Sequence, residues 1–240
     1  MMPMKYRKLD AETRVSAYDW VKIAQSLDAE GTAVLPRLIG PEECEDLATN
    51  YDREDIYRSR VVMARHGFGR GEYKYFSYPL PDLLQKLREA LYPRLAPIAN
   101  RWNRVMHIGV KFPPHHAEFI RRCHRAGQKR PTALILRYAQ DDYNCLHQDL
   151  YGQHVFPLQA TILLSRPGID FDGGEFVVTD AGTNERRAAV VGLSQGDAVI
   201  FTVNQRPAFN GSRKTAMRHG VSRLRKGLRH TVGIIFHDAR

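Results

Sequence analysis

After Pro131 the sequence breaks into short runs that are rich in β-branched and aromatic residues. There are seven such runs, at 132–138, 156–165, 175–179, 187–192, 198–203, 217–221 and 229–236. The pairs Pro167-Gly168, Gly173-Gly174 and Gly196-Asp197 stand between runs and favour turns. Short strands at this spacing are typical of a sandwich, jelly roll or barrel, and not of a sheet built from βαβ units.

Helical signals dominate before residue 130. The pattern predicts one helix that starts at Ser16 as N-cap and ends before Gly31, and another that starts at Pro41. Further helices are expected from Pro81 through Leu91 and over 115–126, a short strand over 31–38, and a loop or edge hairpin over 67–78. We therefore expect a single domain, 1–240, in which a mostly helical layer at 1–130 supports a β core at 131–240.

The composition is that of a globular protein, with 43% hydrophobic and 26% charged residues. No apolar stretch reaches the roughly 18–20 residues of a membrane helix, and the basic N-terminus lacks the apolar core of a signal peptide. The three cysteines, Cys44, Cys123 and Cys145, form no CxxC motif and no even disulfide framework. These features predict a cytoplasmic protein without membrane attachment, and nothing indicates an obligate protein partner.

The chain carries 36 Lys and Arg against 26 Asp and Glu, a net charge of +10. Eight basic and no acidic residues lie between Arg206 and Arg229, and a second basic group lies at 121–130. Such an excess attracts polyanions: nucleic acid, phosphorylated metabolites or an acidic membrane surface. A solvated surface tuned for solubility is the alternative, and the clustering favours an anionic partner. The candidate nucleic-acid contacts in the first stretch are Arg213, Lys214, Arg218, Arg223, Arg225 and Lys226.

The most specific local motif is His147-Gln148-Asp149. In an extended segment the side chains at alternate positions point to the same side, so one imidazole and one carboxylate can bind the same metal ion. A chain with this many His and Asp residues contains such a pair by chance about as often as not, so the motif alone is a weak signal.

Two later features strengthen it. His219 lies in a predicted strand, and two histidines with one carboxylate form the facial triad of non-haem Fe(II) oxygenases. Arg229 and Thr231 follow on the last predicted strand, where a planar guanidinium suits a dicarboxylate co-substrate. A core histidine and a surface arginine are the simpler readings of His219 and Arg229 taken singly.

In this order the motifs resemble those of the 2-oxoglutarate/Fe(II)-dependent dioxygenases, whose core is a double-stranded β-helix, or jelly roll. The segments 31–46, 173–176 and 196–201 are also similar to that superfamily. The resemblance implies a mainly β fold and the cofactors Fe(II), 2-oxoglutarate and O2. It implies that His147, Asp149 and His219 are the catalytic metal ligands, and that Arg229, Thr231 and Tyr138 bind 2-oxoglutarate.

Within the superfamily, the overall likeness is greatest to a bacterial family of oxygenases of alkylated nucleic acid, which implies oxidative dealkylation of damaged DNA or RNA. The metal segment is similar to that of AlkB-type dealkylases, but Leu136 stands where those enzymes place an asparagine. The Arg229-x-Thr231 pattern is instead that of prolyl-hydroxylase-like enzymes. Hydroxylation of a protein side chain or small metabolite therefore stays open, as do a cupin-like binding module and a nucleic-acid-binding protein without catalysis.

Overall fold

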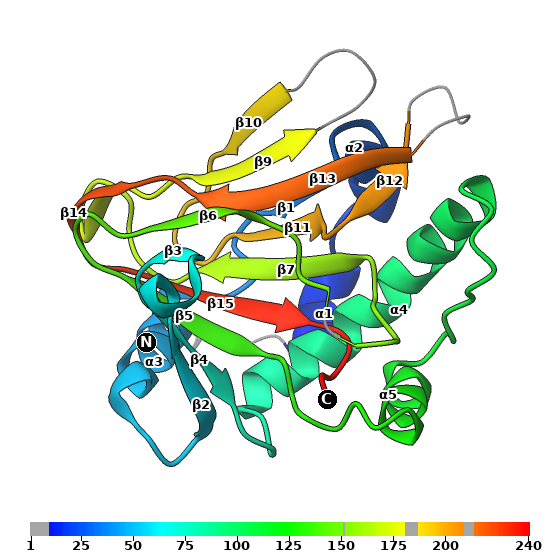
Figure 1. Cartoon of the computed structure of the whole chain (residues 1–240), viewed down its shortest axis with the longest axis horizontal. Helices are drawn as coiled ribbons and strands as arrows, with labels where there is room; N and C mark the ends of the chain where they lie inside the picture. The colour runs from blue at the N-terminus through cyan, green and yellow to red at the C-terminus, as the bar shows by residue number, and fades with distance from the viewer. Residues whose placement is uncertain (1–9, 151, 181–186, 209–213) are drawn as a thin grey trace, which may run out of the picture.

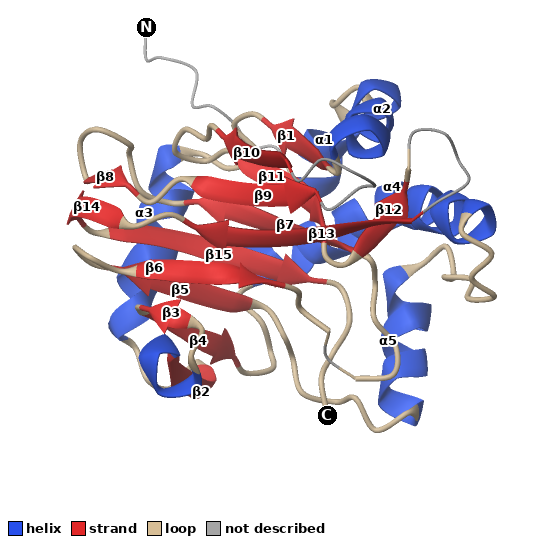
Figure 2. Cartoon of the chain, turned by 45° about the horizontal axis from the view of Figure 1, so that its top comes forward, coloured by secondary structure: helices blue, strands red, loops and turns tan. Residues whose placement is uncertain are grey.

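The computed structural model describes residues 10–150, 152–180, 187–208 and 214–240. Two antiparallel sheets face each other, and helices cover the outer face of the larger sheet (Figures 1 and 2). The large sheet has the order β1 (Thr32–Leu35), β11 (Ala198–Thr202), β7 (Leu158–Leu163), β15 (Arg229–Ile235), β5 (Leu134–Tyr138), β4 (Glu72–Phe76) and β2 (Tyr57–Val62). The predicted mainly β architecture is confirmed.

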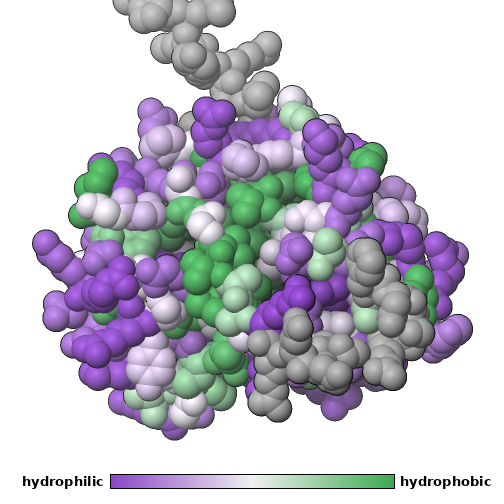
Figure 3. Space-filling model, turned by 90° about the horizontal axis from the view of Figure 1, so that it is seen from above, coloured by the Kyte–Doolittle hydropathy of each residue, from purple (hydrophilic) through white to green (hydrophobic). Residues whose placement is uncertain are grey.

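The small sheet lies above the large one in Figure 1. Its order is β10 (Arg187–Val191), β9 (Phe176–Asp180), β13 (Lys214–Val221), β6 (Tyr143–His147) and β3 (Gly69–Arg70), with β12 (Gln205–Pro207) paired to β13. A separate ribbon joins β14 (Leu224–Gly227) to β8 (Phe171–Gly173). Seen from above, apolar surface lies in the middle of the molecule and hydrophilic side chains surround it (Figure 3).

The described helices are α1 (Ala11–Ser16), α2 (Trp20–Glu30), α3 (Pro41–Thr49), α4 (Asp82–Val105) and α5 (His116–Arg125), with 3-10 turns at Asn50–Asp52 and Met63–His66. The prediction for Ser16 is wrong: it ends α1, and Asp19 caps α2 by accepting from the backbone of Val21 and Lys22. Gly31 closes α2 in the left-handed region, as predicted. None of the helices in the described part of the chain combines the length and the apolarity needed to cross a membrane.

Helix α4 is longer than predicted, because it continues through Pro93 and Pro97 to Val105. A proline inside a helix costs about 3 kcal/mol or more through a lost hydrogen bond and a steric clash. The second half of α4 offsets this cost by burying apolar side chains, Leu95 and Trp102 among them, against the rest of the core. Tertiary packing thus outweighs local propensity here.

The expected boundary near residue 130 separates the helices from most of the strands, but not from all of them. β1, β2 and β4 belong to the large sheet and β3 to the small one. The segment 67–78 is therefore no edge hairpin, since β4 pairs with β2 on one side and β5 on the other. As a result, side chains of β4 line the space between the sheets.

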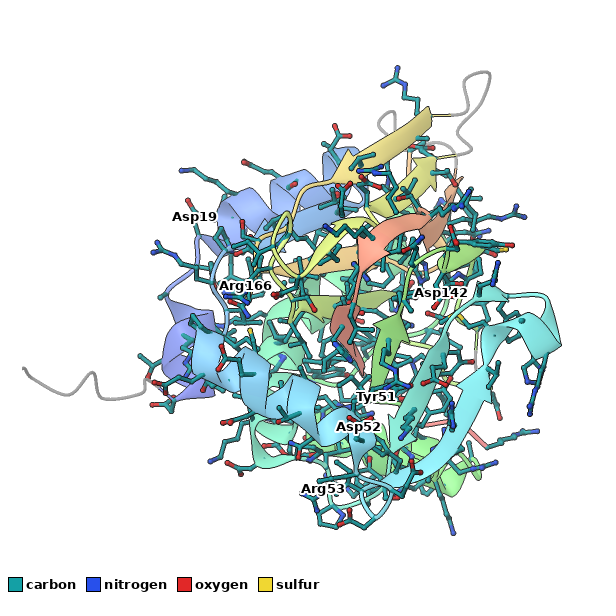
Figure 4. The ribbon with its side chains drawn as sticks, turned by 90° about the vertical axis from the view of Figure 1, so that its left-hand side faces the viewer. Asp19, Tyr51, Asp52, Arg53, Asp142 and Arg166 are labelled. Carbon is teal, nitrogen blue, oxygen red and sulfur yellow. The ribbon has the colours of Figure 1, made fainter. Side chains whose placement is uncertain are left out.

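The main core lies between the large sheet and the helices, and it includes Tyr92, Trp102, Phe119, Phe156 and Phe236. The 3-10 turn after α3 returns to the large sheet, where Tyr51 and Asp52 lie beside β4 (Figure 4). Arg137 of β5 stacks over the Tyr51 ring and pairs with Asp52. These contacts lie on the outer face of the large sheet. The inner face of the sheet turns towards the small sheet.

Candidate metal centre and its cavity

A cavity of about 200 Å³ lies between the inner faces of the two sheets. Because side chains alternate along a strand, β15 contributes every second residue to the cavity wall, namely Arg229, Thr231, Gly233 and Ile235. Neighbouring strands continue the same rows, since Thr231 lies opposite Leu136 on β5 and Leu163 on β7. The register of the large sheet therefore determines where each group stands in the cavity.

His147, Asp149 and His219 meet at this cavity, on the side of the small sheet. Strands β6 and β13 pair with His147 directly opposite His219, and the two ring centroids are 4.2 Å apart. Nε2 of His147 lies 3.4 Å from Oδ1 of Asp149, and Nε2 of His219 lies 3.4 Å from Oδ2. One potential ligand atom from each residue lies within 4.8 Å of the others, which is close enough for one metal ion to contact all three.

The imidazole of His147 is held in the orientation that a metal ligand needs. Its Nδ1 is 2.8 Å from the carbonyl oxygen of Cys145. A carbonyl can only accept, so Nδ1 carries the proton and Nε2 presents its lone pair to the cavity.

The electrostatics of the cluster also suit a cation. Burial alone would raise the pKa of Asp149, but the imidazoles of His147 and His219, each 3.4 Å from one of its oxygens, hold that pKa well below its usual value, so the carboxylate is ionised. Burial lowers the pKa of His219 despite the neighbouring carboxylate, which favours the neutral imidazole that binds metals. Burial also opposes protonation of His147, yet the contact with Asp149 raises its pKa.

Arg229 is a buried cation that is placed to bind an anion. Its side chain is about 2% exposed, and its Nε and Nη1 have no hydrogen-bond partner among the described residues. Burial lowers the pKa of Arg229 to about 10, so the group still carries its charge at neutral pH. An unpaired buried charge is unfavourable, and a carboxylate that binds both guanidinium nitrogens would compensate it.

The other two predicted co-substrate residues flank Arg229 differently. Thr231 lines the cavity two positions along β15. Tyr138 pairs with Arg229 across β5 and β15, and its buried ring lies beneath the guanidinium, 5.5 Å from ring centroid to Cζ. Tyr138 is not part of the cavity wall, so its position suits support of Arg229; its hydroxyl accepts from Asn144.

Sequence reasoning missed several groups of the cavity wall. Tyr73 and Tyr75 of β4 face it, with ring centroids 5.4 Å apart in an edge arrangement, and Phe68 adds a third ring. The alternation Tyr-Lys-Tyr was the available signal, but the segment lacked a clear period. Gln159 and Thr161 of β7 also line the cavity, and polar residues at alternate positions in an apolar run could have identified them.

The described basic residues between 214 and 226 do not line the cavity. Arg218 lies on β13 next to the inward-facing His219, so its exposed side chain points to the outer face of the small sheet. Arg223 pairs with Asp141, and Arg225 with Asp172 and Glu175. Lys214 and Lys226 are exposed, and Arg213 lies outside the described residues. Of the described residues of this stretch, Arg229 alone lines the cavity, and the five described candidates for nucleic-acid contact are not part of its wall.

The fold is that of the 2-oxoglutarate/Fe(II) oxygenases. Crystal structures of a 2OG-Fe(II) oxygenase family oxidoreductase from Burkholderia pseudomallei and a Pseudomonas putida prolyl-4-hydroxylase superpose with TM-scores of 0.57 and 0.53. The first covers 93% of this chain and 94% of its own at 19% identity, and the second 92% and 99% at 12%. The predicted jelly roll is confirmed.

Comparison of the sequence with known proteins identifies the family. Residues 71–239 match the model of a family described as an oxygenase catalysing oxidative methylation of damaged DNA. Two Mycobacterium tuberculosis relatives, the uncharacterized proteins MT2286 and Rv2227, are each 42% identical over 167 residues, 68% of this chain and 72% of theirs. The chain belongs to this oxygenase family, which confirms the predicted enzyme class.

Proposed function

We propose that the protein is an Fe(II)- and 2-oxoglutarate-dependent oxygenase that removes an alkyl group from a nucleic-acid base. The observation that carries the reaction class is the combination, in one cavity, of the His147–Asp149–His219 cluster and the unpaired guanidinium of Arg229. The damaged-DNA description of the family supports the substrate class.

The three ligands fit a metal that keeps further positions open for a co-substrate. When bound, Fe(II), 2-oxoglutarate and O2 supply the oxidation: one oxygen atom enters succinate as CO2 leaves, and the other enters a C–H bond of the substrate. Arg229 holds the distal carboxylate of 2-oxoglutarate by paired hydrogen bonds, and Thr231 offers a hydroxyl on the same strand face. Tyr138 keeps the guanidinium in place from beneath.

The remaining wall suits a flat substrate. Phe68, Tyr73 and Tyr75 present aromatic faces and edges, on which a base extruded from its strand can stack. Hydroxylation of an N-methyl group on such a base gives an unstable hemiaminal, which releases formaldehyde and the repaired base.

The proposal is tested by succinate and formaldehyde formation with iron-loaded protein. Methylated single-stranded and double-stranded oligonucleotides are compared with unmethylated ones of the same sequence, and with a proline-containing peptide and free methylated nucleosides. Formaldehyde from a methylated oligonucleotide, in step with succinate, supports the proposal. Stimulation of succinate formation only by the peptide or the free nucleoside would contradict the nucleic-acid assignment and leave the oxygenase.

A further inference from the structure

A dense group of basic residues around α5 forms no ion pair with a carboxylate among the described residues. Between 111 and 130 the sequence has six basic residues and a single acid, Glu118. The six are Lys111, Arg121, Arg122, Arg125, Lys129 and Arg130, here called the α5 patch, and within the described residues none forms an ion pair with a carboxylate. By contrast, Arg206, Arg223 and Arg225 of the later stretch are all paired.

The patch borders a groove of about 380 Å³ that is distinct from the reaction cavity. Its floor is apolar, with Phe112 beneath and Val110 and Leu150 47% and 49% exposed. Arg122 is part of its wall and, with Arg121 and Arg125, also lines a neighbouring surface hollow that includes Glu118. A groove bordered by basic side chains that form no ion pair with a described carboxylate can follow the backbone of a single strand, and the exposed apolar side chains beside it can contact bases or sugars.

The groove also lies next to the metal centre. Leu150 directly follows Asp149, and Asn204 of the groove wall accepts a 2.9 Å hydrogen bond from Gln148, which lines the reaction cavity. His154, in the same wall, has a pKa lowered by burial and by the charges of Arg122 and Arg125. The Gln148–Asn204 hydrogen bond therefore links the wall of the groove to the wall of the reaction cavity.

We infer that this groove and the α5 patch bind the backbone and flanking nucleotides of a single-stranded nucleic acid whose target base enters the reaction cavity. The inference rests on the proposed function and names its binding surface: the phosphates contact the arginines of α5, and the adjoining bases or sugars lie on the apolar floor. It also replaces the 206–229 stretch as the electrostatic contact.

The test measures binding of a fluorescein-labelled, unmethylated 12-nucleotide oligothymidylate as a function of salt. The variant Arg121→Glu/Arg125→Glu is compared with Lys214→Glu/Lys226→Glu, which changes the net charge equally at exposed, unpaired sites of the later stretch. Thermal unfolding shows whether both variants remain folded. We expect the α5 variant to lose about tenfold or more in affinity, and the slope of log affinity against log salt to flatten by about 1.4, or 0.7 per lost contact.

The control variant should lose much less, because neither Lys214 nor Lys226 lines the groove. Equal losses in the two variants, or a larger loss in the control, would overturn the inference while leaving the proposed function intact. If the wild type binds the oligonucleotide at low salt but the α5 variant binds equally well, the inference also fails. Failure of the proposed function is seen separately, as absence of formaldehyde from methylated oligonucleotides with the wild type.

Discussion

Gly174 lies against the side chain of Arg229, and the contact leaves no room for a larger residue. A Cβ atom on Gly174 would stand 3.0 Å from Cδ of Arg229 and 2.5 Å from Cδ1 of Leu224. Its φ of +63° is also in the left-handed region that favours glycine. The Gly173-Gly174 turn that the sequence shows thus has a role beyond reversing the chain: it lets the arginine reach the cavity.

Gly174→Ala should therefore weaken 2-oxoglutarate binding by about tenfold as well as destabilise the fold, because the methyl group displaces the Arg229 stem. Anaerobic titration calorimetry of the Fe(II)-loaded protein with 2-oxoglutarate measures the affinity for 2-oxoglutarate. Gly168→Ala is the matched control: its φ is +75°, but nothing lies within 4 Å of the added Cβ. Both variants carry the left-handed strain of about 1–2 kcal/mol, and only Gly174→Ala should lose affinity. An equal effect in both would show that strain alone is responsible.

Substitution of Arg229 should separate binding from stability. We expect Arg229→Lys to raise the 2-oxoglutarate concentration needed for half-maximal turnover by about tenfold or more, since an ammonium cannot reproduce the paired hydrogen bonds. Arg229→Leu should abolish 2-oxoglutarate binding and yet raise the unfolding temperature without ligand, because it removes an unpaired buried charge. Normal 2-oxoglutarate dependence in both variants would place the carboxylate anchor elsewhere.

Two buried histidines, His116 and His237, predict that the fold loses stability in acid. Burial lowers the pKa of His116 to about 3 and that of His237 to about 4. Below pH 6.5 the unfolded chain binds protons at these sites that the folded chain refuses, so the free energy of unfolding falls as the pH decreases towards 4. At 1.36 kcal/mol per pKa unit, acidification from pH 6.5 to pH 4 removes roughly 3 kcal/mol at most for each histidine.

The measurement is urea denaturation between pH 7.5 and pH 4.5. His116→Gln can still donate to the carbonyl of Phe236, as Nε2 of His116 does, but it does not titrate. It should lose less stability on acidification than the wild type, whereas the exposed neighbour substitution His115→Gln should behave as the wild type does. Identical pH profiles for all three proteins would refute this assignment.

The buried ion pair Arg88–Asp238 fixes the chain end to α4. Nη2 of Arg88 lies 2.8 Å from Oδ1 of Asp238, and both side chains are almost fully buried. The carboxylate of Asp238 also accepts hydrogen bonds from Tyr78 and His124. Arg88→Met should cost about 3–5 kcal/mol of unfolding free energy, because it leaves the carboxylate buried without its main partner. Arg53→Met, at the exposed pair with Asp55, should cost under about 1 kcal/mol (Figure 4). Comparable losses would mean that burial is not decisive.

Much of the fold could be predicted from local pattern. The runs at 187–192 and 229–236 correspond to β10 and β15 within a residue or so, and Gly31 ends α2 as its conformational freedom requires. β2 and β6 were not predicted, because partly exposed strands without strict alternation carry little signal. The length of α4 could not be read either, since its prolines argue against a helix and only tertiary packing outweighs them.

Part of the candidate site could likewise be predicted from the sequence, and part could not. His147, Asp149, His219 and Arg229 could be found because their spacing follows a known order of motifs, and the structure brings all four to one cavity. Tyr73 and Tyr75 could not, because their place in the cavity depends on β4 pairing with β5, a long-range contact. Net charge likewise could not tell which arginines are neutralised: that depends on partners such as Asp141 and Asp172, which only the folded chain supplies.

The central claim, that His147, Asp149 and His219 hold one iron that 2-oxoglutarate turnover requires, is tested most directly by anaerobic Fe(II) titration of the wild type and of Asp149→Ala and His219→Ala. We predict one equivalent of bound Fe(II) and 2-oxoglutarate-dependent succinate formation for the wild type. Each variant should remain folded by circular dichroism, bind iron at least about 10-fold more weakly and form no succinate. Wild-type iron stoichiometry, affinity and turnover in His219→Ala would contradict the account.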